Sequence, residues 1–497
     1  MIKSIPIGTF AFFLYLNAIV SAQSQPNIVV LLADDLGWSA VGYHNREFET
    51  PHIDSIVRDG MELDQFYVAP MCSPTRAGFM TGRYPIRFGL ARAVIPPQRD
   101  FGLPTDETTI AEALGELGYE HRGVFGKWHL GHRRAKWHPL NQGFTHFHGH
   151  YNGAIDYFDL TREGERDWHT NFDASDEQGY STDLIAAAAA GWIKQVASEE
   201  APYFCYVPFN APHSPFQAPD SAVERFERMS PQGQARRDRK SSPVRQTYAA
   251  MIWKMDQGIG KILQAIEQSG ESDQTIVLFF SDNGGVGKIR DNNAPLRGSK
   301  LTVFEGGTRV PACVRWPGHI APGTKSDARM GYVDLMPTLV ALAGGKANSM
   351  TDKPLDGIDI APLLLGEAAQ PLTARLESRP WFSYHGQQGE QSEHLAVIHD
   401  GWKLKVNGPR LRSPSQLRSG TNQVQLFHLS QDPLEADDLA STDNEQLERL
   451  GRLLIDHRAL QPDDAVPPYS VGSKGFQPPP KWTLDPEHPN AKVGTDG

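Results

Sequence analysis

Short apolar runs alternate with amphipathic stretches along the first 375 residues. Each run is apolar on both faces, which is typical of a buried strand of a parallel sheet. In Thr105–Leu117 the apolar residues recur three and four positions apart, and a longer stripe of this kind extends from Tyr248 to Ile266, before Gly270. Both stretches predict helices. Strands that alternate with helices predict an α/β fold, built on a large mixed, mostly parallel sheet flanked by helices. The predicted strands are Asn27–Ala33, Tyr203–Val207 and Thr275–Phe280.

The pattern changes after about residue 375. Short alternating stretches at Trp402–Val406 and Gln425–Leu429 predict strands, and an amphipathic stretch near Glu445–His457 predicts a helix. These elements indicate a smaller C-terminal antiparallel sheet with one helix. We therefore expect a large domain over residues 26–375 and a smaller α+β domain over residues 376–497.

Two polar segments lie outside this pattern. The tail beyond Gln461 is rich in Pro and Gly, which predicts an irregular conformation. Residues 229–247 are polar and basic, with Arg236, Arg237, Arg239 and Lys240. We interpret this segment as a solvated loop; a lid over an anionic substrate is the alternative.

The first 22 residues have the pattern of a secretory signal peptide. Lys3 precedes an apolar stretch from Ile5 to Val20, and small residues follow at Ser21-Ala22. A membrane anchor is the alternative, but the stretch is shorter than the roughly 20 residues that a span needs. We expect cleavage, no membrane span in the mature chain, and a secreted or periplasmic location.

The acidic balance of the chain limits its partners. There are 59 Asp and Glu residues against 48 Lys and Arg, a formal net charge of −11. Such a chain repels nucleic-acid phosphates, so we expect no nucleic-acid partner. An anionic substrate would have to meet a local basic pocket. Three cysteines are too few for a disulfide framework.

Acidic pairs follow two of the predicted buried strands. Asp34 and Asp35 come directly after the first strand, and Asp282 and Asn283 follow the last. The carboxyl ends of parallel strands share one edge of a sheet, where ligands bind in open α/β folds. Three carboxylates at one edge repel one another unless a cation joins them, and an all-oxygen set favours Ca²⁺ first and Mg²⁺ second. A single pair of this kind is more often a turn or a helix cap; two placed alike favour a metal site.

One segment is more specific than these pairs. Residues 72–83 read Cys-Ser-Pro-Thr-Arg-Ala-Gly-Phe-Met-Thr-Gly-Arg. This segment resembles the modification motif of type I sulfatases, in which the cysteine is oxidised to Cα-formylglycine. The resemblance extends from about Asn27 to Ala343 and is closest in form to the arylsulfatase B-like enzymes. The motifs that complete it are Gly126–Gly131, Asn210–Pro215, Gly298–Lys300 and Glu305–Pro311.

The resemblance implies a role for each matching residue. It implies the alkaline phosphatase superfamily fold and a calcium ion held by Asp34, Asp35, Asp282, Asn283 and the modified Cys72. It gives Arg76 the task of holding the hydrated formylglycine. It further implies that Lys127 and Lys300 grip the sulfate oxygens, and that His129 and His213 form the acid–base pair.

These residue types suit the hydrolysis of a sulfate monoester. The ester is an anion, so cations are needed to stabilise it and the charge that develops on the leaving oxygen. A hydrated aldehyde at position 72 attacks sulfur, His213 with Lys300 protonates the leaving alcohol, and His129 assists the expulsion of sulfate. Because the resemblance is to arylsulfatase B-like enzymes and export is expected, we predict a sulfated carbohydrate as substrate. A formylglycine-generating or anaerobic sulfatase-maturating enzyme is the implied partner.

Two other functions remain open. A phosphodiester or phosphonate monoester hydrolase of the same superfamily uses the same aldehyde and metal. A non-catalytic glycan-binding relative would not need the full set of basic residues. Faster turnover of an aryl phosphate diester than of an aryl sulfate would identify the first alternative. Equal glycan binding by wild type and Cys72→Ala, with no sulfate release by either, would identify the second.

Several remaining residues have simpler readings. His146, His148 and His150 alternate as zinc ligands sometimes do, but they lack a zinc motif and are interpreted as loop or pocket-rim residues, with His150 a candidate substrate contact. Cys205 and Cys313 lie in apolar surroundings and are expected to be buried. Glu305 and Arg309 are expected to be structural. The residues that we consider for a sugar pocket are Arg92, Arg99, Tyr151 and Asp156.

Overall fold

The computed structural model describes residues 25–199, 201–229, 242–289, 291–367 and 370–485. The predicted signal peptide and the basic residues from Arg236 to Lys240 therefore lie outside the described residues. Among the described helices, none combines the length and the apolar character that crossing a lipid bilayer requires.

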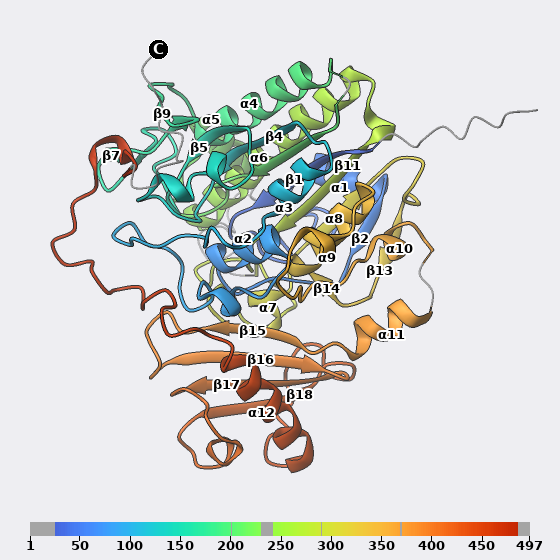
Figure 1. The fold of residues 1–497 in the computed structure, drawn as a ribbon, viewed down its shortest axis with the longest axis vertical. Helices are drawn as coiled ribbons and strands as arrows, with labels where there is room; N and C mark the ends of the chain where they lie inside the picture. Colours follow the sequence, from blue (N-terminus) through green and yellow to red (C-terminus); the bar gives the residue numbers. More distant parts are fainter. Residues whose placement is uncertain (1–24, 200, 230–241, 290, 368–369, 486–497) are drawn as a thin grey trace, which may run out of the picture.

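A ten-stranded sheet forms the centre of the molecule (Figure 1). Its five middle strands are parallel, and Val30 of the central strand lies opposite both Tyr206 and Leu278. In sheet order these strands are β11 (Thr275–Ser281), β1 (Asn27–Ala33), β10 (Tyr203–Pro208), β4 (His121–Lys127) and β5 (His146–His150). All of β1, β10 and β11 is buried, as the continuous apolar runs predict.

Shorter strands extend the sheet at both edges. Antiparallel pairing joins β12 to β11 and to β2 on one side, and joins β8 to β5 and to β9 on the other. The predicted large, mixed and mostly parallel sheet is thus confirmed. The edge strands are β12 (Ala312–Arg315), β2 (Met61–Leu63), β13 (Thr324–Ser326), β8 (His169–Thr170) and β9 (Asp173–Ala174).

Helices cover both faces of this sheet (Figure 1). Alternate residues of β1 point into two different apolar clusters: Ile28 and Val30 into one, Val29 and Leu31 into the other. The first cluster contains residues of α2 (Cys72–Thr81), α3 (Ile110–Glu116) and α8 (Leu335–Leu342). The second contains residues of α1 (Pro51–Arg58), α4 (Ser181–Val196), α5 (Asp220–Met229) and α6 (Pro243–Ser269).

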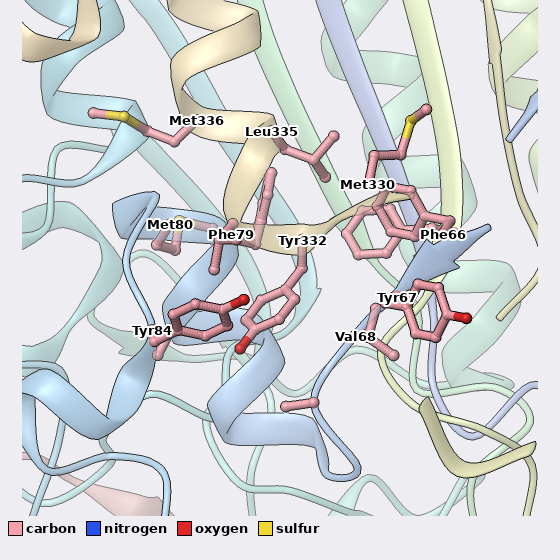
Figure 2. Packing of buried hydrophobic residues seen from close by; sticks show 14 of the residues in the cluster. Phe66, Tyr67, Val68, Phe79, Met80, Tyr84, Met330, Tyr332, Leu335 and Met336 are labelled. Carbon is pink, nitrogen blue, oxygen red and sulfur yellow. The ribbon is translucent and has the colours of Figure 1, made fainter. Parts of the chain in front are cut away.

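The helix α2 is held from behind by aromatic and thioether side chains (Figure 2). Phe79 and Met80 of α2 lie beside Leu335 and Met336 of α8, and the ring of Phe79 is 5.3 Å from that of Tyr206. Every residue of α2 is buried. Because protein interiors are close-packed, this contact fixes the position of the helix and of the side chains at its first turn.

Two helices begin elsewhere than the apolar spacing predicts. The helix predicted from Thr105 begins only at Ile110, because Thr109 and Glu112 form a capping box that defines the start. The helix predicted from Tyr248 begins earlier, at Pro243 after the cap Ser242, and ends at Gly270 as expected. The interpretation of residues 243–247 as loop is therefore wrong.

The C-terminal part has the predicted antiparallel sheet, drawn at the bottom of Figure 1. Its apolar residues join the same cluster as one face of the large sheet. A buried ion pair also links the two parts, because Lys403 contacts Glu305 of α7 (Glu305–Thr308) at 2.9 Å. The elements are β15 (Trp381–His385), β16 (Glu393–His399), β17 (Trp402–Gly408), β18 (Gln423–His428) and α12 (Asn444–Arg458).

The tail beyond Gln461 is largely irregular, as predicted, yet it packs against the large domain. Figure 1 shows it in red, running from the C-terminal sheet along one side of the molecule towards β7 (Glu165–Arg166). We call residues 461–485 the strap. The remaining elements are β3 (Phe66–Tyr67), β14 (Met330–Gly331), β6 (Thr161–Arg162), β7 (Glu165–Arg166), α9 (Ala347–Met350), α10 (Ala361–Leu364) and α11 (Gln370–Ser378).

Candidate active site

The two acidic pairs meet at the carboxyl edge of the sheet. Asp34 and Asp35 follow β1, and the adjacent parallel strand β11 ends just before Asp282 and Asn283. All four side chains are buried. The amide of Asn283 donates to Asp35 Oδ1 at 2.8 Å, and the backbone N–H of Asp35 donates to Asp282 Oδ1 at 3.3 Å. The geometry brings together the oxygens that the strand pattern predicts.

The electrostatics of the acidic cluster fit a cation site. Burial, together with the nearby Asp34, raises the pKa of Asp282 to about 6. Burial also acts to raise the pKa of Asp35, but Lys300 and His213 outweigh it and hold that pKa below its usual range. Carboxylates that are this crowded gain most from a hard cation among them.

Cys72 lies directly over this cluster. It is the first residue of α2, and its Sγ is 3.4 Å from Asp34 Oδ1 and 3.4 Å from Asn283 Oδ1. Lys300 Nζ approaches the same sulfur to 3.4 Å. Burial and Asp282 raise the pKa of the Cys72 thiol. An unmodified cysteine here is therefore held as a neutral thiol.

Arg76 lies one helical turn after Cys72 and is fully buried. Its guanidinium donates to Asp282 Oδ2 from Nε at 3.0 Å and from a terminal nitrogen at 2.8 Å, and to the Lys127 carbonyl oxygen at 2.6 Å. These three bonds join the strands β11 and β4 to α2. Arg76 thus balances the charge of Asp282, and its predicted contact with the modified Cys72 stays a prediction.

Two lysines balance the other carboxylates. Lys127, the last residue of β4, donates to Asp34 Oδ2 at 2.6 Å, and Lys300 donates to Asp35 Oδ1 at 2.6 Å. Lys127 is fully buried, whereas Lys300 lines a cavity above the cluster. Three cations therefore face three carboxylates. A divalent cation added to this set leaves an excess of positive charge, which an anionic substrate would offset.

His129 lines the same cavity as Cys72. Its Nε2 lies 3.1 Å from the Ile95 carbonyl oxygen, and its own carbonyl accepts a bond of 3.0 Å from the Ser73 hydroxyl. The ring Nδ1 is buried without a hydrogen-bond partner among the described residues. Burial, with Lys127 and Arg76 nearby, lowers the pKa of His129 well below its ordinary value. The neutral ring can accept a proton.

His213 approaches the cluster from the loop after β10. Its Nε2 lies 3.6 Å from Asp35 Oδ2, and its carbonyl accepts a hydrogen bond of 2.8 Å from the Tyr157 hydroxyl. Burial, only partly offset by Asp35, lowers the pKa of His213 to about 3. His129 and His213 therefore come from different loops and line the same cavity as Cys72.

A cavity of about 480 Å³ opens above Cys72. His129, His213 and Lys300 line it together with Cys72, as the sequence predicts. The sequence did not indicate its outer wall. That wall is formed by residues 94–97, Arg162, Gln387 and Tyr469.

The residues considered for a sugar pocket have other surroundings. Tyr151 is buried and stacks on His169, and Asp156 accepts hydrogen bonds from Gln217 and from the backbone of its own turn. Arg99 holds the strap, and Arg92 pairs with Glu390 at 3.6 Å. In the described lining of the cavity, residues 94–97 and 153–154, which lie between these four in sequence, take their places. The distant Arg162, Gln387 and Tyr469 join them, which no spacing along the chain could indicate.

Other secondary expectations have mixed outcomes. His146, His148 and His150 are not loop or rim residues, because they form β5 inside the large sheet. His150 is fully buried, and its Nδ1 lies 3.0 Å from the Asn152 carbonyl oxygen. Cys205 and Cys313 are buried in strands, as expected.

Comparison with known proteins agrees with this geometry. Residues 26–345 match the family model described as Sulfatase. The chain is 34% identical over 471 residues to the N-acetylgalactosamine-6-sulfatase of Rattus norvegicus, covering 87% of this chain and 84% of that protein.

Solved structures share the fold. Ps i-CgsB, solved in complex with k-i-k-neocarrahexaose, is 28% identical with a TM-score of 0.75, covering 88% of this chain and 94% of that one. The phosphonate monoester hydrolase of Agrobacterium radiobacter is 20% identical with a TM-score of 0.61, covering 89% and 97% of the two chains. At that identity the likeness concerns the fold alone.

Proposed function

The chain belongs to the sulfatase family and is a sulfuric ester hydrolase, and from this premise we propose that it desulfates a carbohydrate through a Cα-formylglycine at position 72 and a bound calcium ion. The observation that carries the proposal is the position of Cys72. Its sulfur is within 3.4 Å of a carboxylate, an amide oxygen and a lysine, at the base of a cavity. The name of one relative, N-acetylgalactosamine-6-sulfatase, supports a sulfated carbohydrate as the substrate.

The residues around position 72 fit both groups. Asp34, Asp35, Asp282 and Asn283 offer hard oxygen ligands, which favour Ca²⁺ over softer metals. When present, a hydrated aldehyde at position 72 would supply a nucleophilic hydroxyl, and the ion would lower the pKa of that hydroxyl. Oxidation at position 72 needs an enzyme that acts on Cys72, so a formylglycine-generating or anaerobic sulfatase-maturating enzyme is part of the proposal.

The remaining groups each have a task in this reaction. Lys300 lines the cavity and binds the sulfate oxygens, and it stays protonated because Asp35 raises its pKa against the effect of burial. His213 lies beside Lys300 in the lining, and its ring is neutral in the free protein. The negative charge of a bound sulfate ester would favour the protonated ring, which then donates its proton to the leaving sugar oxygen. His129, a neutral ring that lines the cavity with Cys72, accepts a proton in the step that expels sulfate. Lys127 and Arg76 keep the acidic residues in place.

Sulfate release tests the proposal. The protein is produced with a formylglycine-generating enzyme, conversion is read from the mass of the peptide that contains Cys72, and sulfate release is measured on 4-nitrophenyl sulfate and on sulfated oligosaccharides. We expect turnover by converted protein, its loss in Cys72→Ala, and its loss after chelation with recovery on adding Ca²⁺. Faster turnover of bis(4-nitrophenyl) phosphate than of any sulfate ester would favour the phosphodiester hydrolase instead. Equal glycan binding by the converted protein and by Cys72→Ala, with no sulfate release by either, would favour the non-catalytic relative.

Export from the cytoplasm completes the proposal. It rests on the signal-like first 22 residues, which end a few residues before β1. N-terminal sequencing of protein secreted by a host with a general secretion pathway tests it. A mature terminus near Gln23 agrees with the proposal, and an intact Met1 in a cytoplasmic fraction contradicts it.

A further inference from the structure

Besides residues 94–97, three segments that are far apart in sequence form the outer wall of the cavity. They are the hairpin of β6 and β7, the loop after β15, and the strap, and they contribute Arg162, Gln387 and Tyr469. A sulfate group is small compared with a cavity of about 480 Å³. The outer part of the cavity is therefore available to the rest of a substrate.

The strap is fixed along its path by hydrogen bonds to the large domain. The backbone N–H of Val466 donates to the Gly89 carbonyl at 2.8 Å. Arg99 donates to the carbonyls of Pro468 and Val471 at 2.8 and 3.1 Å. The N–H of Tyr469 donates to the Gln387 carbonyl at 2.8 Å, which joins two of the three segments. Tyr469 is thus placed by its backbone.

The end of the strap fixes the hairpin. Trp482 is fully buried, and its indole N–H donates to the Arg162 carbonyl at 3.0 Å. The N–H of Lys481 donates to Glu165 at 2.9 Å, and the N–H of Asp485 donates to the Arg133 carbonyl at 2.8 Å. The backbone that carries Arg162 is therefore held in place before any ligand arrives.

The positive charge of Arg162 is paired only with an exposed carboxylate. Its Nε lies 3.3 Å from the carboxylate of Glu163, the next residue on the hairpin, and this Nε–H is buried without a hydrogen bond to any described residue. Glu163 is 46% exposed, and exposed pairs of this kind contribute little. Lys300, by contrast, is bonded to Asp35.

The described lining of the cavity contains no Asp or Glu. Its charged residues are Lys300 at the base and Arg162 at the wall. A cavity with this lining attracts a ligand that carries negative charge at both ends.

Neutral groups beside Arg162 suit a sugar ring. Tyr469 is 38% exposed and lines the cavity together with Pro96 and Pro97, so these side chains offer apolar groups to a sugar ring. The side-chain oxygen of Gln387 is buried without a hydrogen-bond partner among the described residues. A sugar hydroxyl that donates to this oxygen would satisfy it.

We propose that Arg162, Gln387 and Tyr469 form a subsite for a second anionic group of the substrate, a sulfate ester or a carboxylate carried by the sugar beyond the reacting ester. The inference rests on the proposed function in naming the substrate as a sulfated sugar. Arg162 binds the second anion, Tyr469 packs against the ring, and Gln387 accepts a hydroxyl. The subsite selects oligosaccharides that carry at least two negative charges.

Binding is measured first, because it does not require turnover. In a Cys72→Ser background loaded with Ca²⁺, isothermal titration calorimetry compares ligands with one and two anionic groups. The ligands are N-acetylgalactosamine 6-sulfate, its 4,6-disulfate, a glucuronate-containing disaccharide of the 6-sulfate, and neocarrabiose with one or two sulfates. We expect a two-anion ligand to bind about 10-fold more tightly than its one-anion counterpart, and Arg162→Gln to abolish that preference. The disulfate and glucuronate arms distinguish the two kinds of second anion.

Turnover gives the second readout. In converted enzyme, Arg162→Gln should raise KM for the preferred two-anion substrate about 10-fold, with little change in kcat, and leave kcat/KM for 4-nitrophenyl sulfate within twofold. The matched control Arg452→Gln removes an exposed arginine of α12 and should change neither substrate. Tyr469→Ala should weaken one-anion and two-anion ligands alike, since it removes packing.

Three outcomes overturn the subsite. The first is that no ligand pair shows a preference that depends on Arg162. The second is that Arg162→Gln weakens one-anion and two-anion ligands equally, which indicates a structural role. The third is that 4-nitrophenyl sulfate turnover falls as much as that of the oligosaccharide. Failure of the proposed function appears differently, as absent sulfate release while the calorimetric preference and its dependence on Arg162 persist.

Discussion

A methyl group at position 153 should displace His129, which lines the cavity together with Cys72. Gly153 lines the cavity, and a Cβ built on it would lie 2.4 Å from both Cε1 and Nε2 of His129. Non-bonded carbon atoms prefer about 3.5–4 Å, so the ring must retreat by about 1 Å. That movement cannot leave the bond of 3.1 Å from Nε2 to the Ile95 carbonyl intact.

The backbone of His129 gives little room for relaxation. Its N–H donates to the Tyr151 carbonyl at 3.0 Å, its carbonyl accepts from Ser73, and its φ is 57°, in the left-handed region. A misplacement of about 1 Å in a reacting group costs about 100-fold in rate. We therefore expect Gly153→Ala to lower kcat by about 100-fold, equivalent to about 2.7 kcal/mol of barrier.

The assay is 4-nitrophenyl sulfate turnover per converted Cys72, with thermal unfolding measured alongside. Gly191→Ala is the matched control, because it adds the same methyl on an exposed face of α4 with nothing within 4 Å. In a His129→Ala background, Gly153→Ala should have no further effect, since the two changes act on one group. A kcat within twofold of wild type, or a full additional loss in the His129→Ala background, would refute the reasoning.

Three other perturbations test the energetics. Lys403→Met removes the ammonium that lies 2.9 Å from both Glu305 and Glu435. Urea denaturation should show that the free energy of unfolding falls by about 3–5 kcal/mol. A fall of less than about 1 kcal/mol would contradict this. Arg76→Met unpairs Asp282, and the loss should be larger in chelator than in Ca²⁺, because the ion replaces the missing charge; equal losses would argue against a cation there. Burial lowers the pKa of four histidines to about 3–4, so between pH 6.5 and about 4 they bind protons only in the unfolded chain. The free energy of unfolding should therefore fall as the pH falls through that window, by up to about 1.4 kcal/mol per pH unit for each histidine. A free energy of unfolding that does not change with pH would contradict the prediction. These histidines are His132, His138, His385 and His457.

The proposed subsite gives the strap a role in substrate binding. The same residues that stop the tail from moving also place Tyr469 and Arg162, so the C-terminal part takes part in forming the cavity without supplying a reacting group. Arg99 illustrates the point. Considered for a sugar pocket, it instead holds the strap that carries Tyr469.

The sequence alone determined the central elements and the chemistry at the base of the cavity. Buried parallel strands are apolar at every position, so β1, β10 and β11 could be located to within about one residue. Polar residues directly after β1 and β11 must share an edge if the strands are parallel, which placed Asp34 beside Asp282. The motif around Cys72 pointed to the proposed nucleophile, because its residue types lie within α2 and its flanks.

The tertiary structure decided everything that depends on packing between distant segments. Lys127 and Lys300 each donate a hydrogen bond to an aspartate, yet Lys127 is fully buried and Lys300 lines the cavity. Only the tertiary surroundings of the two side chains decide this difference. The outer wall joins β6, the loop after β15 and the strap, which are separated by more than 300 residues from first to last. Periodicity and capping are local signals, and they carry no information about which irregular segment covers which face. That choice is made by the collective burial of side chains, and it sets the part of the cavity that selects the substrate.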